Sequence, residues 1–149
     1  MEQLEINTPL KDEVTAAAEI KLFSEAGILI ATFIGSIFAG GYLMALNYKR
    51  LGLTESYKKS LLISTVATLL LFAIIIFGEV SSNIPNIVFT LPQIMAVYFI
   101  AKQYQKPLIE KHKYEGGMLA SNWLAAGIGA IIMLIVMVIL FAVIYSTMM

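Results

Sequence analysis

The chain has 149 residues, of which 59% are hydrophobic and only 13% are charged. A soluble domain has about 45 to 50% apolar and about 25% charged residues, so this composition argues against a water-soluble globule and predicts a membrane protein. The ten basic and ten acidic residues balance, which removes the electrostatic basis for binding nucleic acid.

The sequence lacks the residues that disulfide bonding, metal binding and nucleophilic catalysis require. The chain has no cysteine, which excludes disulfides, thiolate metal sites and a cysteine nucleophile. Its one histidine, His112, cannot build a multi-histidine metal site. No glycine-rich phosphate loop or nucleophile motif is present. We therefore expect a protein that is not an enzyme, with no catalytic residue, no cofactor and no metal.

Residues 1–24 form an acidic N-terminal tail, whose charge is wrong for a secretory signal. Thr8 followed by Pro9 predicts the start of a short helix with one weakly apolar side. This tail either lies on the membrane surface or frays in water.

The rest of the chain, residues 25–149, is predicted to be an all-α membrane domain. A spanning helix needs about 20 apolar residues, because about 30 Å of hydrocarbon is crossed at about 1.5 Å per residue. Four stretches are predicted to span: residues 26–46, 60–78, 84–101 and 123–145. We expect these four transmembrane helices to pack as two hairpins, with Ser24 and Ser121 as N-caps of the first and fourth.

The stretch at residues 84–101 is the shortest of the four and contains Pro85 and Pro92. A proline inside a helix cannot donate its backbone hydrogen bond, so a kink is predicted at Pro92. We interpret this stretch as a kinked span. The alternative is a re-entrant pair of half-helices.

Small residues follow one another at four-residue steps in the first helix. They form a helix-packing face of Gly27, Ala31, Gly35 and Ala39. Ser36 and Gly40 lie in a second row, and the fourth helix repeats the pattern with Ala126, Gly129 and Ala130. Lipid offers little hydrophobic drive for helix pairing, so close approach at small residues has to supply the contact. We favour packing inside one protomer over a seam between protomers.

Polar side chains gather near the middle of the third span. This candidate midplane site comprises Asn86, Thr90 and Gln93. A broken helix with an amide at the midplane can bind a polar solute or line a narrow path. The favoured alternative is structural, with Gln93 bonded to a hydroxyl of the second helix. The candidate hydroxyls are those of Ser64, Thr65 and Thr68.

Basic residues concentrate in two predicted loops, residues 47–59 and 102–120. They are Lys49, Arg50, Lys58 and Lys59 in the first and Lys102, Lys106, Lys111 and Lys113 in the second. Cytoplasmic loops accumulate such residues, so both loops are predicted to be cytoplasmic and both termini outside. Each lysine near an anionic leaflet is worth about 1 kcal/mol, so anionic headgroups of the bilayer are expected partners.

Three stretches carry a resemblance to known proteins. They are the run Ala31-Thr32-Phe33-Ile34-Gly35 to Gly41-Tyr42-Leu43, the run Asn47-Tyr48-Lys49-Arg50-Leu51-Gly52, and Ser121-Asn122-Trp123. In these the chain resembles a group of small four-helix inner-membrane proteins of bacteria to which no activity is assigned. The resemblance covers most of the predicted spans and implies a location in the bacterial cytoplasmic membrane. It implies no site residue.

Two functions fit these observations. The first is a structural or assembly subunit that works through helix packing and its basic loops, either as a homo-oligomer or with a membrane-protein partner. The alternative is a small channel or transporter protomer that uses the midplane site around Gln93. That alternative requires a hydrated cavity that reaches Gln93.

Overall fold

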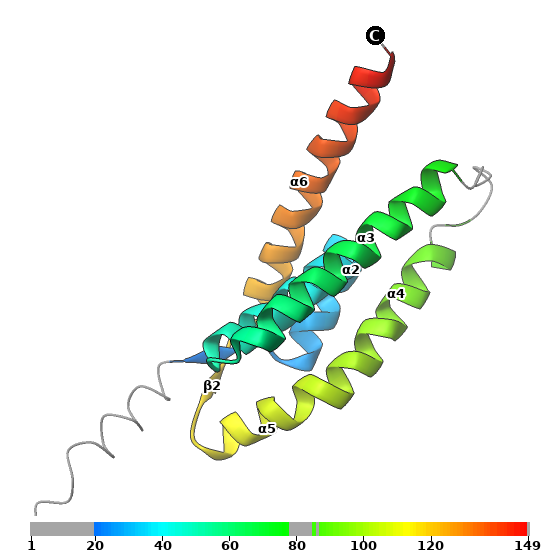
Figure 1. Ribbon diagram of the computed structural model, residues 1–149. Coiled ribbons are helices and arrows are strands. Elements are labelled where there is room, and N and C mark those ends of the chain that lie inside the picture. Colours follow the sequence, from blue (N-terminus) through cyan, green and yellow to red (C-terminus); the bar gives the residue numbers. More distant parts are fainter. Residues whose placement is uncertain (1–19, 78–84, 86, 149) are drawn as a thin grey trace, which may run out of the picture.

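The structure is a computed structural model that describes residues 20–77, 85 and 87–148. Figure 1 shows how its elements are arranged. In chain order they are β1 (Lys21–Leu22), α2 (Glu25–Arg50), α3 (Thr54–Phe77), α4 (Ile87–Ile100), the π-helix η1 (Ala101–Gln105), α5 (Lys106–Tyr114), β2 (Met118–Leu119) and α6 (Asn122–Met148). The predicted all-α class is confirmed, and β1 and β2 form one two-residue parallel pair.

Three of these helices are long and apolar enough to cross a membrane. By length and composition they are α2 over Glu25–Arg50, α3 over Thr54–Ile74 and α6 over Asn122–Val143. The third predicted span, α4, is shorter, with 14 residues. It passes through Pro92 as one helix, so it is not a pair of half-helices.

The helix α2 folds back on itself. Its backbone leaves the helical conformation at Gly35 and Ser36. A straight helix of its 26 residues would hold the two ends about 39 Å apart. Instead, the backbone N–H of Phe23, just before α2, donates to Asn47 Oδ1 at 2.7 Å, near the other end. The apolar segment predicted at residues 26–46 is therefore not one continuous helix, and α2 is a hairpin of two half-helices, residues 25–34 and 37–50.

A contact inside the hairpin supports the same geometry. Thr32 and Gly40 are eight residues apart, which is about 12 Å along a straight helix. In the structure the Thr32 side chain lies where a Cβ on Gly40 would be. The small residues around the turn thus let the two half-helices approach each other closely.

The α2 hairpin is the centre around which the other long helices pack. Among the described residues, α3, α4 and α6 all contact α2 and make few contacts with one another. Figure 1 shows α6 leaving the other helices towards its C-terminal end. The expected arrangement of two paired hairpins is therefore replaced by three helices around one central hairpin.

The predicted loop 102–120 is largely helical. The chain continues from α4 through η1 into α5, and the Lys106 N–H donates to the Ala101 carbonyl in a π-type turn. Pro107 cannot donate to the carbonyl four residues before it, which favours a change of helix type at this point. Exposed i,i+4 pairs, Lys106 with Glu110 at 3.7 Å and Lys111 with Glu115 at 3.8 Å, add modest support to α5.

The N-terminal described residues lie at the same end of the molecule as the basic segments. Lys21 pairs with Met118 and Leu22 with Leu119 in the β1–β2 ladder. The Arg50 side chain also donates to the Lys21 carbonyl. The sequence interpretation placed the N-terminus on the face opposite the basic loops, and the structure differs from it at residues 20–22. The predicted helix start at Thr8 lies outside the described residues.

Candidate functional site

The turn of the α2 hairpin is held by Gln93 of α4. Because the helix is interrupted at Gly35 and Ser36, the N–H of Ile37 has no carbonyl of a preceding helical turn to bond. It donates to Gln93 Oε1 at 3.1 Å. The Gln93 Nε2 group donates to the Phe89 carbonyl at 2.9 Å. Both ends of the amide are thus used inside the protein.

The other members of the predicted midplane site are placed differently. Asn86 lies outside the described residues, and Thr90 lies on α4 three residues before Gln93. The candidate hydroxyl partners on α3 bond carbonyls of their own helix instead of Gln93; they are Ser64, Thr65 and Thr68. The structure therefore joins Gln93 to α2 rather than to α3.

Ser36 is a polar residue at the turn that the sequence reasoning did not single out as a site. Its φ of 71° and ψ of −178° lie in a region that glycine alone adopts readily. Its hydroxyl is buried and has no hydrogen-bond partner among the described residues. A serine that follows a glycine at mid-segment was the available signal for this turn.

Three members of the predicted packing face lie against α6. A Cβ on Gly35 would lie 2.5 Å from the Gly129 carbonyl oxygen, and one on Gly27 would lie 3.2 Å from the Ala125 Cβ. A Cβ on Gly129 would lie 3.0 Å from the Ala31 carbonyl oxygen. The first half-helix of α2 and the start of α6 therefore meet backbone to backbone.

The fourth member of that face, Ala39, belongs to the second half-helix. Its Cβ would be 2.7 Å from a Cβ on Gly35, across the turn. The row is therefore divided by the hairpin and does not form one straight stripe. On α6 the buried side is formed by Ala125, Gly129 and Ile132, whereas the predicted Ala130 is exposed.

A buried amide cluster, formed by Asn47, Gln105 and the Phe23 backbone, joins the two ends of the hairpin to η1. Asn47 Nδ2 donates to the Phe23 carbonyl at 2.9 Å and to Gln105 Oε1 at 3.0 Å. Both amide side chains are fully buried. The cluster was not predicted from the sequence. The available signal was that an uncharged amide residue stands close to basic residues at the end of α2, where Asn47 precedes Lys49, and at the end of η1, where Gln105 precedes Lys106.

His112 fastens the N-terminal segment to the same end. Its Nε2 lies 2.9 Å from the Ile20 carbonyl oxygen and 3.3 Å from that of Met118, and its side chain is buried. The imidazole ring occupies the space beside Gly117. In the part of the chain that the structure describes, no group of three histidine or acidic side chains is placed to hold a metal ion.

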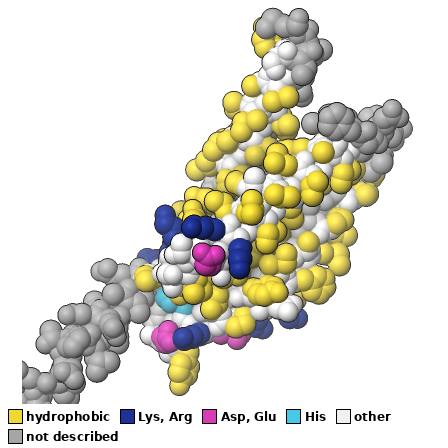
Figure 2. All heavy atoms as spheres, viewed as in Figure 1, with side chains coloured by type: hydrophobic (Ala, Val, Ile, Leu, Met, Phe, Trp, Pro, Cys, Tyr) yellow, Lys and Arg dark blue, Asp and Glu magenta, His cyan; other side chains and the backbone are white. Residues whose placement is uncertain are grey.

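The predicted basic residues lie on helices at one end of the molecule. Lys49 and Arg50 end α2, Lys58 and Lys59 lie in the first turns of α3, and Lys102 to Lys113 lie on η1 and α5. Figure 2 shows charged side chains gathered at this end, below a predominantly hydrophobic surface. The charged end and the apolar surface are thus separated along the molecule.

Two kinds of groove flank the second half-helix of α2. The first, which we name the tyrosine groove, has a volume of about 340 Å³ and lies between α2, α3 and α4 with η1. Tyr48, Lys59 and Tyr104 line it near the charged end, and Ile37 and Val97 line it near the hairpin turn. Gln93 does not line it.

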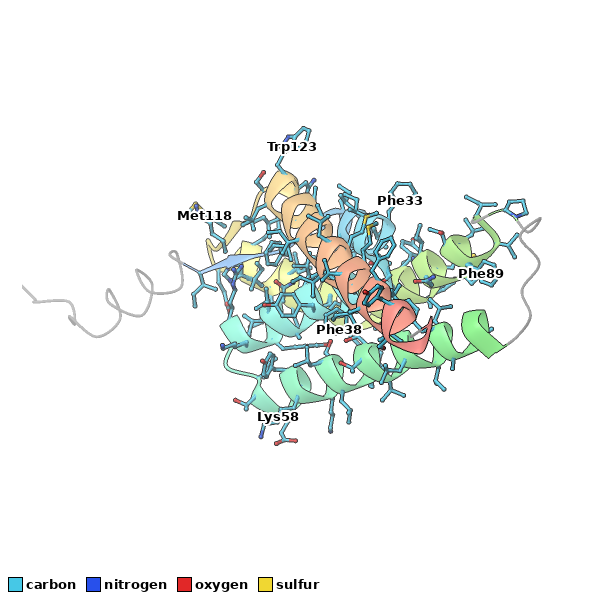
Figure 3. All side chains as sticks on the ribbon, turned by 90° about the horizontal axis from the view of Figure 1, so that it is seen from above. Phe33, Phe38, Lys58, Phe89, Met118 and Trp123 are labelled. Carbon is cyan, nitrogen blue, oxygen red and sulfur yellow. The ribbon has the colours of Figure 1, made fainter. Side chains whose placement is uncertain are left out.

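The second, which we name the apolar cleft, runs along α6. It consists of a hollow of about 270 Å³ between α3 and α6 and an adjoining hollow of about 410 Å³ between α2 and α6, which share Phe38, Ile132 and Ile135. Figure 3 shows Phe38 beside α3 and α6, whereas Trp123 extends away from the bundle. The cleft lining is almost wholly apolar.

Comparisons of the chain with known proteins give no significant match, whether to a protein-family model, to a curated protein or to a solved structure.

Proposed function

We propose that the chain is a non-enzymatic integral membrane protein that acts as an assembly subunit. Its apolar cleft receives a transmembrane helix of a partner, which in a homo-oligomer is α6 of a second copy. The observation that carries this proposal is that α3 and α6 both pack on α2 and yet leave a cleft between them.

The lengths of the helices explain why the hollow between α3 and α6 is open along α6 towards Ile139. The longer arm of the α2 hairpin, residues 37–50, extends about 21 Å, whereas the 27 residues of α6 extend about 40 Å. Beyond the turn at Ser36, α6 therefore continues without the central hairpin beside it. Helices in lipid associate through close packing, and an unfilled cleft forgoes the dispersion contacts that drive such association.

We propose a topology with three crossings and one re-entrant hairpin. The 14 residues of α4 and the 5 of η1 together extend about 28 Å, close to the hydrocarbon thickness. In this topology α3, α4 with η1, and α6 cross the membrane, and α2 enters and leaves on one side. The basic end is cytoplasmic and the C-terminus is outside. The resemblance noted above supports a bacterial cytoplasmic membrane.

A re-entrant hairpin is compatible with the bilayer only if its turn is protected from lipid. Non-helical backbone at membrane depth is tolerated where protein buries it or where it lines a water-filled cavity. Gly35 lies against Gly129 of α6, and Ile37 is bonded to Gln93 of α4. These contacts favour the assembly role over the channel or carrier, since the Gln93 amide is already occupied by backbone groups.

Native mass spectrometry of the full chain in nanodiscs tests the proposal. We expect the wild type to carry a second copy or a membrane-protein partner, and Ile135→Trp, which obstructs the cleft, to lose it. Val138→Trp is the matched control, because Val138 lies three residues further along α6, is 68% exposed and does not line the cleft. A wild-type chain that carries neither, or an Ile135→Trp variant that keeps its partner, would contradict the proposal.

A further inference from the structure

The tyrosine groove changes in chemistry along its length. At the charged end it is lined by Tyr48, Tyr104 and Lys59, and Ser56 lies one turn before Lys59 on α3. Towards the hairpin turn its lining becomes aliphatic, with Ile37 and Val97. A polar end with hydrogen-bond donors and an apolar remainder suit an amphipathic ligand.

The length of the groove matches one leaflet. From Tyr48 to Ile37 the second half-helix of α2 extends about 16 Å, which is about half of the hydrocarbon core of about 30 Å. Its volume of about 340 Å³ is at the low end of the range of about 300 to 1,000 Å³ for ligand sites. The groove therefore has the depth of one acyl chain that starts at the cytoplasmic headgroup level.

The π-turn of η1 contributes to the polar end of the groove. It presents Tyr104 to the groove while the adjacent Gln105 is buried against Asn47. The Gln105 side chain also donates to the Met44 carbonyl at 3.4 Å. One buried amide thus joins the turn that carries Tyr104 to α2, and single π-turns inside helices are frequent at functional sites.

Lys59 brings a positive charge that its neighbours do not neutralise. The ammonium of Lys49 lies over the Tyr57 ring, that of Lys102 lies over the Tyr98 ring, and Lys106 pairs with Glu110. Among the described residues, Lys59 has neither an ion pair nor an aromatic ring as a partner. Lys59 is therefore available to pair with a phosphate at the groove.

We infer that the tyrosine groove binds one anionic phospholipid of the cytoplasmic leaflet. One acyl chain lies along the second half-helix of α2, and the phosphate accepts hydrogen bonds from Lys59 and the tyrosine hydroxyls. Both kinds of headgroup carry a phosphate, but the choline of a zwitterionic headgroup would bring a second positive charge close to Lys59, so the groove favours an anionic headgroup. The inference does not depend on the proposed assembly role, because the apolar cleft is on the other side of α3.

Lipid titration followed by native mass spectrometry of the full chain in detergent tests this selectivity. Phosphatidylglycerol and phosphatidylcholine with the same acyl chains are the probes. We expect one phosphatidylglycerol to be retained, and Lys59→Gln to weaken its retention about fivefold, as expected for the loss of one lysine near an anionic surface. Lys58→Gln is the matched control, because Lys58 is the adjacent exposed lysine of α3 and does not line the groove.

A second pair of variants tests the acyl chain. Ala67 lines the groove and Val66 does not, although both lie on α3. Ala67→Phe should displace the lipid, whereas Val66→Phe should retain it, and the thermal unfolding midpoint of each variant shows that it is folded. Equal losses from Lys59→Gln and Lys58→Gln, or displacement of the lipid by glycerol phosphate, would overturn the inference. A changed copy number with normal lipid binding would bear on the assembly role alone.

Discussion

At the scale of single residues, side-chain amides take the place of backbone partners where the helices are interrupted. Gln93 accepts from Ile37 N–H at the turn of α2, and Asn47 both accepts from and donates to the backbone of Phe23. A buried backbone group without a partner is costly, and more so in hydrocarbon, where water cannot substitute. The hairpin thus depends on two side-chain amides. Gln93 is distant from the turn in sequence, and Asn47 lies near the C-terminal end of α2.

Replacing Gln93 with leucine tests this dependence. Gln93→Leu keeps a similar volume and leaves the Ile37 N–H without its acceptor, so we expect a loss of about 1 to 3 kcal/mol in unfolding free energy. The control is Gln103→Leu, because Gln103 is exposed on η1. Thermal unfolding in detergent, with hydrogen exchange at the Ile37 amide, measures both variants. If the exchange rate of the Ile37 N–H is unchanged in Gln93→Leu, the Gln93 side chain does not hold the turn.

At the scale of elements, the long apolar helices are the part of the fold that the sequence predicts well. The lengths of α3 and α6 follow from apolar runs, and the predicted N-caps are confirmed: the Ser24 and Ser121 hydroxyls accept from Gly27 and Trp123. These features are local, so a pattern of neighbouring residues is enough to predict them.

The hairpin in α2 could not be predicted in this way. An apolar stretch with small residues at four-residue steps is equally compatible with a straight helix and with two half-helices. The choice is made by Gln93 of α4 and Gly129 of α6, which are distant in sequence and meet the turn only in the folded chain. The amide cluster of Asn47 and Gln105 and the tyrosine groove were missed for the same reason.

The contact between α2 and α6 should be sensitive to a side chain on Gly35. A Cβ there would meet the backbone of Gly129 at 2.5 Å, and backbone cannot rotate away as a side chain can. We expect Gly35→Leu to lower the unfolding free energy by about 3 kcal/mol or more, at the upper end of the cost of overpacking. Thermal unfolding in detergent gives the measurement.

Gly127→Leu is the matched control for this element. Gly127 also lies in α6, near Gly129, and no atom lies within 4 Å of a Cβ added there. Its leucine variant should stay within about 0.5 kcal/mol of the wild type, as surface substitutions usually do. Comparable losses in the two variants would mean that the Gly35–Gly129 contact is not a principal support of the fold.

At the scale of the whole molecule, the hairpin determines at which end of the molecule the N-terminal described residues lie. The strand β1 pairs with β2, and Phe23 bonds to Asn47, so residues 20–23 stay at the end that carries the basic residues. A straight first span would have carried them to the opposite end. In the topology that we propose, the chain therefore crosses the membrane three times rather than four, because α2 turns back.

Single-cysteine labelling distinguishes these two topologies, since the chain has no cysteine of its own. Lys21→Cys and Lys58→Cys should react with a membrane-impermeant maleimide from the same side of sealed vesicles, and Ser146→Cys should react only from the other side. The reason is geometric: Lys21 lies beside Met118 and Arg50 at the basic end, whereas Ser146 is near the far end of α6. Labelling of Lys21→Cys together with Ser146→Cys would instead require α2 to cross the membrane, and the central hairpin would then not exist in the bilayer.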